Sequence, residues 1–131
     1  MTHFEKVKNY LLDLEYEIVL EDKIEEVLIV NKESKGIKNL VIDCEDPILI
    51  IEQMLFEVKQ DSLEMYKSLL QKNADIIHGA FVLTSDGKRV MFRDTLQLEN
   101  LDLNELEASI NSLSLLLSEY YEELLKFSKQ Q

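Results

Sequence analysis

The side chains best suited to catalysis are one cysteine and two histidines, His3 and His78, and they are far apart in the sequence. A cysteine nucleophile needs a histidine or another base within hydrogen-bond distance. Cys44 has no histidine near it in sequence, so a catalytic pair would require the fold to bring His78 close. A structural cysteine packed near the end of a strand is the simpler interpretation, and we predict no catalytic residue.

Carboxylates are abundant, but their spacing defines neither a reaction centre nor a metal site. Asp43, Glu45 and Asp46 flank the cysteine and could be imagined around a hard cation. Calcium loops need regularly spaced oxygen ligands and a chain reversal at glycine, and this segment has neither. The chain's three glycines also cannot form the glycine-rich loops that bind nucleotide phosphates. We therefore expect no metal, no cofactor and no enzymatic activity.

The charge balance restricts the class of partner. The 131 residues include 26 Asp and Glu against 14 Lys and Arg, for a formal net charge of -12. Nucleic acid and anionic membrane surfaces are poor partners for such a chain, because both attract basic proteins. The acidic surface serves solubility, or it favours basic or mainly apolar segments of a protein partner.

Cysteine usage and hydropathy predict the compartment. A single cysteine excludes an intrachain disulfide and favours a reducing environment. The first residues form an amphipathic helix pattern without a secretion signal, and no apolar run approaches the ~18 residues that span a bilayer. We expect a single domain over residues 1–131, located in the cytoplasm.

The first half of the chain predicts a helix followed by an antiparallel meander. Thr2 and Glu5 have the spacing of a capping box for a helix from His3 to Leu14. Pro47 interrupts the strands, and the apolar run from Ile48 to Ile51 predicts a strand covered on both faces. The earlier strands are expected at Tyr16 to Leu20, Val27 to Val30 and Leu40 to Asp43.

The second half predicts a helix, a hairpin and a further helix. The first helix should begin at Asp61 and end at Asn73 in a left-handed conformation. Asp86 and Gly87 predict a type I′ turn joining strands from Ile76 to Thr84 and from Arg89 to Leu96. The expected buried residues of the helix are Leu63, Tyr66, Leu69 and Leu70, and the expected core pairs of the hairpin are Leu83 with Val90 and Phe81 with Phe92.

The other face of the hairpin is the best candidate for a binding surface. Arg89 and Arg93, the only arginines of the chain, alternate with Met91 opposite Val82. Methionine adapts to varied partners, and arginine can stack on them or pair with their carboxylates. The alternative is that the arginines form internal ion pairs. We assign partner contact to Val82, Arg89, Met91 and Arg93.

A long helix is expected from Asp102 to the end of the chain, with Asp102 as its N-cap. Its apolar residues recur at heptad spacing, and it is longer than one small sheet needs. The excess could pack against a second subunit. We therefore assign Leu113, Leu117 and Tyr120 to self-association.

Together these patterns predict an α+β fold, with an antiparallel β-sheet of about five to six strands and helices packed on it in the order α-β-β-β-(β)-α-β-β-α. The C-terminal part carries a motif that consists of Gly79-Ala80-Phe81-Val82-Leu83, Asp86-Gly87, Val90-Met91-Phe92-Arg93 and Thr95-Leu96-Gln97-Leu98 through Leu101-Asp102. On these residues the chain resembles the YbjN-like and CesT-like (Tir chaperone) proteins of the type III secretion chaperone-like fold.

The resemblance implies a bacterial, usually homodimeric protein without catalytic residues. The secretion chaperones of this group hold an extended client segment against apolar grooves, and the YbjN-like members have proposed regulatory roles. We therefore expect a non-enzymatic module that binds a protein or peptide client through apolar sheet or helix surface on an acidic homodimer.

Two other functions remain open. A small-molecule-responsive regulatory domain would hold a ligand between the sheet and the C-terminal helix, in a closed apolar pocket with convergent polar groups. An enzyme built from scattered residues would need Cys44, His78 and a carboxylate within hydrogen-bond reach.

Overall fold

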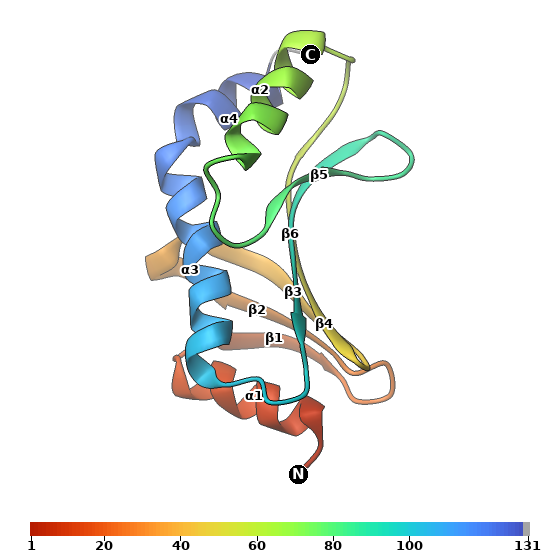
Figure 1. Ribbon diagram of the computed structural model, residues 1–131, viewed down its shortest axis with the longest axis vertical. Helices are drawn as coiled ribbons and strands as arrows, with labels where there is room; N and C mark the ends of the chain where they lie inside the picture. The colour runs from red at the N-terminus through yellow and green to blue at the C-terminus, as the bar shows by residue number, and fades with distance from the viewer. Residues whose placement is uncertain (130–131) are drawn as a thin grey trace.

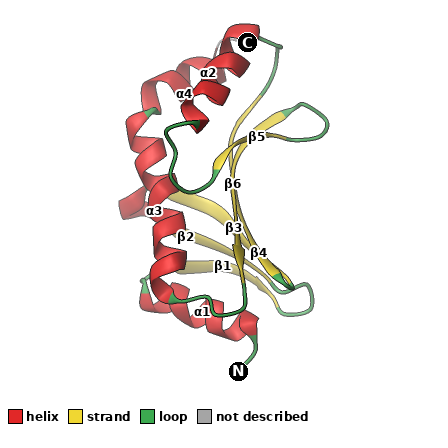
Figure 2. Ribbon diagram, viewed as in Figure 1, coloured by secondary structure: helices red, strands yellow, loops and turns green. Residues whose placement is uncertain are grey.

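The computed structural model describes residues 1–129, and its centre is one twisted antiparallel sheet with the helices gathered on one side (Figures 1 and 2). The strands pair in the order β1-β2-β3-β4-β6-β5. The strands are β1 (Glu17–Asp22), β2 (Val27–Lys32), β3 (Ile37–Glu45), β4 (Ile48–Glu57), β5 (Ala80–Leu83) and β6 (Arg89–Gln97). The helices are α1 (His3–Asp13), the short 3-10 helix η1 (Glu33–Lys35), α2 (Leu63–Asn73), α3 (Leu103–Glu119) and α4 (Tyr121–Lys129).

Local hydrogen bonds begin two helices where the sequence predicts. At α1, Glu5 N–H donates to Thr2 Oγ1 (3.1 Å) and Thr2 N–H donates to Glu5 Oε2 (3.2 Å), which completes the capping box. At α3, Glu105 N–H donates to Asp102 Oδ1 (2.8 Å), so Asp102 is the N-cap. Both predicted helix starts are confirmed. The strand pairing and the helices described above confirm the α+β class and the antiparallel sheet.

Strand β4 corrects one prediction. Leu49 and Ile51 are fully buried, whereas Ile48 and Ile50 are only half-buried. The run from Ile48 to Ile51 is thus covered on one face and not on both, because the helices of the described chain all pack on the same side of the sheet. Two of the four apolar side chains in this run, Ile48 and Ile50, therefore lie on the face of the sheet that the helices do not cover.

Helix α2 begins one residue later than predicted, because Ser62 and not Asp61 is the N-cap: its Oγ accepts a hydrogen bond from Met65 N–H (3.2 Å). The predicted buried face is wrong in part. Met65 and Leu69 are buried, but the side chains of Leu63 and Leu70 are 70% and 69% exposed. The helix therefore turns two leucines away from the core.

Asn73 is the last residue of α2. The prediction of a left-handed ending there is wrong, because the C-cap residue Ala74 keeps a right-handed conformation (φ -63°, ψ -25°). Its side chain instead contacts the backbone of β5. Asn73 Nδ2 donates to the carbonyl of Phe81 (3.1 Å), and Asn73 Oδ1 accepts from the N–H of Phe81 (2.8 Å). The amide thus takes the place of a neighbouring strand at one residue of this edge.

The hairpin has the predicted register and a different turn. Phe81 pairs with Phe92 and Leu83 with Val90. A type I′ turn needs positive φ at both central residues, but only Gly87 (φ +74°) has it, and Asp86 does not. The first strand is also shorter than predicted, and Leu83 stays 45% exposed at its end.

The C-terminal helix is interrupted, which contradicts the prediction of one continuous helix. Tyr120 has φ -107° and ψ 15°, and the chain turns there from α3 into α4. Helix α4 then packs on β4, with Leu124 and Phe127 buried. The apolar residues beyond the break therefore cover the sheet of the same chain.

Candidate protein-binding surface

One face of the sheet carries no helix in residues 1–129, and the predicted partner residues lie on it (Figure 1). Met91 on β6 lies opposite Val82 on β5 and opposite Met54 on β4. Val82 and Met91 are half-buried, and Met54 is 46% exposed. Arg89 and Arg93 alternate with Met91 on the same strand, so the structure brings all four predicted residues to this face.

Sequence reasoning missed that the apolar part of this face extends across the sheet. Cross-strand pairing connects Leu20 with Ile29, Ile29 with Val41, and Asp43 with Ile50. On β2, β3 and β4, each of these positions alternates with a residue buried under the helices. We call the surface the helix-free face; its apolar residues include Leu20, Val27, Ile29, Val41, Ile48, Ile50, Met54, Val82 and Met91.

The two arginines differ in their partners. Arg93 Nη1 lies 3.5 Å from Glu52 Oε1 on β4, and both side chains keep solvent access. Such an exposed pair adds only about 0–1 kcal/mol to stability. Arg89 makes no ion pair with any residue in the described part of the chain. Internal pairing thus explains one arginine, while the other leaves its guanidinium open to a partner.

The part of the helix-free face on β3, away from the two arginines, is acidic. Asp43 lies on β3 near Glu45 and Glu52, and burial, followed by the charge of Glu45, raises the pKa of the Asp43 carboxyl. Within the described residues nothing donates a hydrogen bond to its buried Oδ1 atom. A cationic group of a partner would stabilise the ionised carboxylate there. The helix-free face therefore carries arginines on β6 and carboxylates on β3, and apolar side chains lie between these two charged groups.

The residues suited to catalysis do not form a reactive group. Cys44 is buried, and burial, followed by the charge of Glu26, raises its thiol pKa to about 12. His78 lies in the loop before β5, where its carbonyl accepts a hydrogen bond from Ser112 Oγ (2.7 Å). No cluster of histidine, cysteine or carboxylate groups suited to a metal ion occurs among residues 1–129. At neutral pH the thiol is protonated and therefore a poor nucleophile.

The residues assigned to self-association serve the interior of one chain. Leu113 is fully buried in the core, which corrects its assignment to an exposed contact, and Leu117 is half-buried against that core. The Tyr120 ring packs near the Phe81 ring, with 6.2 Å between the two ring centroids. Lys72 Nζ lies 5.2 Å from the centroid of the Tyr120 ring.

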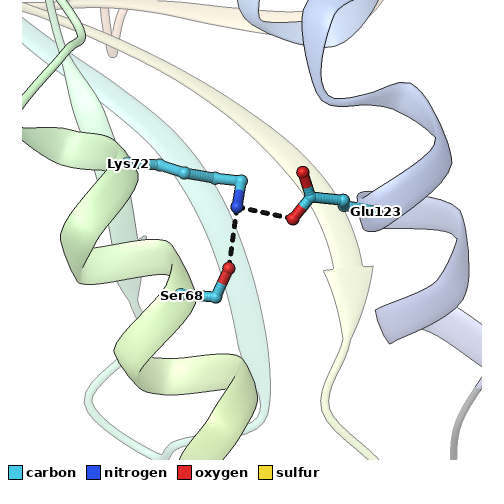
Figure 3. Close-up of polar contacts among 3 residues, drawn as sticks. All are labelled: Ser68, Lys72 and Glu123. Carbon is cyan, nitrogen blue, oxygen red and sulfur yellow. Dashed lines mark hydrogen bonds and ion pairs between the residues drawn. The ribbon is translucent and has the colours of Figure 1, made fainter.

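Lys72 also ties α2 to α4 (Figure 3). Its Nζ donates to Ser68 Oγ (2.7 Å) and to Glu123 Oε2 (2.6 Å). Exposed apolar side chains in this region include Leu63 and Leu70 on α2 and Leu83 on β5. Ile77 and Leu115, near Tyr120, are exposed as well.

A groove of about 640 Å³ lies between the end of β4 and helices α3 and α4. Its apolar lining includes Leu55, Leu117 and Tyr121. Tyr121 is 62% exposed, so the site is open and differs from the closed pocket that a small-molecule sensor would need.

Within the described residues no helix is long and apolar enough to cross a bilayer.

Comparison with known proteins gives the same architecture. The family model CesT_Tir_1 matches residues 1–130. The structure of YbjN from E. coli, described as a candidate transcription regulator, has a TM-score of 0.68 at 15% identity, over 91% of each chain. No curated protein matches the sequence.

Two solved chaperone structures are similar as well. The HopA1-SchA chaperone-effector complex has a TM-score of 0.65 at 13% identity, over 91% of this chain and 94% of the other. The Yersinia pestis type III secretion chaperone SycH, in complex with a stable fragment of YscM2, has a TM-score of 0.58 at 14% identity, over 97% and 100%. These matches confirm the predicted fold resemblance.

Proposed function

The chain belongs to the CesT_Tir_1 family, and from this premise we propose that it is a non-enzymatic, chaperone-like protein that binds a segment of another protein. The helix-free face is the observation that carries the proposal. Apolar side chains that stay accessible on several adjacent strands of a folded protein indicate an interaction site. Two of the similar structures are described as chaperones bound to an effector or to a protein fragment, which supports the same class of function.

The chemistry of the face suggests the kind of client segment. Met54 and Met91 provide flexible, polarisable contacts that adapt to different apolar side chains. Arg89 can take a carboxylate or stack on an aromatic ring of the client. Asp43 and its neighbouring carboxylates favour a basic residue at the other end. The client segment is therefore mainly apolar, with at least one basic residue, which also suits the net charge of -12.

We propose in addition that the protein is a homodimer in the cytoplasm. Leu63, Leu70 and Leu83 form an exposed apolar surface on α2 and β5, and burying it against a second copy would remove it from water. Light scattering across micromolar concentrations should give twice the chain mass, and Leu70→Glu should give the chain mass. A wild-type monomer at every concentration would contradict the dimer.

Affinity purification from the native cell tests the binding proposal. A protein that co-purifies with the wild type should be lost with Met91→Glu, because a charge would enter the helix-free face between Met54 and Val82. Leu12→Glu is the matched control, since Leu12 is 49% exposed on α1, away from that face. The proposal fails if no protein co-purifies with the wild type, or if Met91→Glu and Leu12→Glu retain the same partners.

A further inference from the structure

The groove of about 640 Å³ between β4 and helices α3 and α4 differs in charge from the whole protein. Lys35 is the only charged residue among the described residues that line it, in a chain with a net charge of -12. The rest of the lining is apolar or neutral. An anionic ligand therefore meets attraction at this groove, whereas the carboxylates on β3 would repel it.

The side chain of Gln53 lines the groove and has an unused hydrogen-bond donor. The residue is only 6% exposed, and its Oε1 accepts a hydrogen bond from Lys38 N–H (3.2 Å). Within residues 1–129 no group accepts a hydrogen bond from its Nε2 atom. Buried amide groups are normally paired, so a free donor beside a groove indicates an acceptor that a ligand supplies.

Lys35 lies at the same end of the groove as Gln53, because Lys38, whose N–H bonds Gln53, follows it by three residues. Lys35 Nζ donates to Asn111 Oδ1, and an ammonium group has further donors to give. The Lys35 carbonyl accepts a hydrogen bond from Ser114 Oγ (2.8 Å), which holds η1 against α3. This end of the groove therefore combines a positive charge with a free amide donor.

The helical side of the groove is apolar. Leu117 on α3 is half-buried, and Tyr121 and Leu125 on α4 are 62% and 38% exposed. Leu55 faces them from the bulge of β4. A hydrocarbon chain can lie along such an open apolar surface, because it has no hydrogen-bonding groups that would lose water without replacement.

We propose that this groove binds a single-chain carboxylate amphiphile, such as a medium-chain fatty acid. The carboxylate accepts hydrogen bonds from Lys35 and Gln53, and the ionic one is the stronger of the two. The hydrocarbon chain lies along Leu117, Tyr121 and Leu125, with one side still in water. The inference goes beyond the proposed protein-binding function and uses a surface other than the helix-free face.

NMR titration with octanoate, decanoate and dodecanoate, each below its micelle concentration, tests the proposal. The side-chain amide signals of Gln53 should shift, because Nε2 gains an acceptor. Affinity should rise with chain length, by at most about fourfold for each methylene that the groove buries. Decylammonium has a hydrocarbon chain of the same length and a cationic head, and it should bind at least about tenfold more weakly than decanoate.

Three variants identify the groove. Lys35→Gln should weaken decanoate binding at least about tenfold, and Lys38→Gln is the matched control, since Lys38 does not line the groove. Gln53→Glu keeps an acceptor for Lys38 N–H but replaces the free donor with an oxyanion, so it should also weaken binding. Leu125→Glu should do the same by repelling the carboxylate. Circular dichroism confirms that each variant is folded.

Four results would overturn the inference. The wild type does not bind decanoate, or decylammonium binds as tightly as decanoate, which would indicate apolar adsorption alone. Lys35→Gln and Lys38→Gln weaken binding equally, which would indicate only the overall charge. Met91→Glu abolishes binding while Leu125→Glu does not, which would place the chain on the helix-free face. None of these results decides the co-purification experiment, so the proposed function is tested separately.

Discussion

The two faces of the sheet are made from similar residues that reach different environments. On β6, Phe92 points into the core and is fully buried, while its neighbour Met91 points to the helix-free face and is half-buried. On β4, Leu49 and Ile51 are fully buried, and Ile50 between them is not. Side chains of similar hydropathy thus stabilise the fold on one face and leave apolar surface for a partner on the other.

The two faces differ in how much burial free energy remains available for binding a partner. Full burial of an Ile or Phe side chain contributes about 1.5–3 kcal/mol, which the covered face already gives to folding. On the helix-free face part of that contribution is still unused, so a client segment can gain it on binding. The comparison predicts that substitutions on the covered face lower stability, and that substitutions on the helix-free face lower binding.

Adjacent residues of β6 give the largest expected contrast. Phe92→Ala should lower the free energy of unfolding by about 3–5 kcal/mol, because it leaves a cavity in the core. Met91→Ala should cost about 1 kcal/mol or less. Urea denaturation measures both values, and similar costs for the two variants would show that the faces do not differ as described.

Gly79 tests how tightly the covered face is packed beneath the hairpin. A Cβ atom at Gly79 would lie 2.4 Å from Cζ of Phe92, and the residue has φ +81°. Gly79→Ala should therefore cost about 2–4 kcal/mol from overpacking and backbone strain together. Gly36→Ala is the control, since Gly36 has φ +70° but open space around it. Its cost should be about 1–2 kcal/mol from strain alone. Equal thermal shifts for the two variants would argue against close packing at Phe92.

Asn73 tests the closed edge of the sheet. Asn73→Ala leaves the N–H and carbonyl of the buried Phe81 without their side-chain partners and should cost about 1–3 kcal/mol. Gln71→Ala, on the exposed side of the same helix, should have almost no effect. Chemical denaturation provides the free energies. An unchanged stability of Asn73→Ala would mean that the two hydrogen bonds do not hold the edge.

The smallest effect concerns Asp43 on the helix-free face. Its folded-state pKa is raised above the ordinary value of 3.8, so the folded protein binds this proton more tightly than the unfolded chain does. The stabilisation by the proton is complete below that value and is lost as the pH rises through the folded pKa. Asp43→Asn should therefore be more stable than the wild type at neutral pH, with the difference vanishing in acid. A stability difference that does not depend on pH would contradict this account.

The sequence predicted those features of the fold that short-range chemistry determines. The Asp86-Gly87 turn fixed the pairing of Phe81 with Phe92, and Thr2 and Asp102 marked the starts of helices. These signals lie within a few residues of the structure they specify. Four of the candidate binding residues were placed on one face for the same reason, because side chains alternate along a strand.

The features that the sequence did not predict depend on contacts between distant segments. Helical spacing at α2 is compatible with two apolar stripes, and only packing decides that Met65 is buried and Leu70 is exposed. The heptad pattern runs through the break at Tyr120, beyond which α4 packs on β4. The extent of the helix-free face was missed because an apolar run does not reveal how many of its sides are covered.

Methyl NMR of the four methionines tests the central claim most directly. Met91 and Met54 lie on the helix-free face, whereas Met65 belongs to α2, is buried on the covered side and serves as an internal reference. Adding the partner protein captured from the native cell should shift the Met91 and Met54 methyl signals and leave that of Met65 unchanged. A bound complex in which the Met91 signal does not move would contradict the assignment of partner binding to the helix-free face.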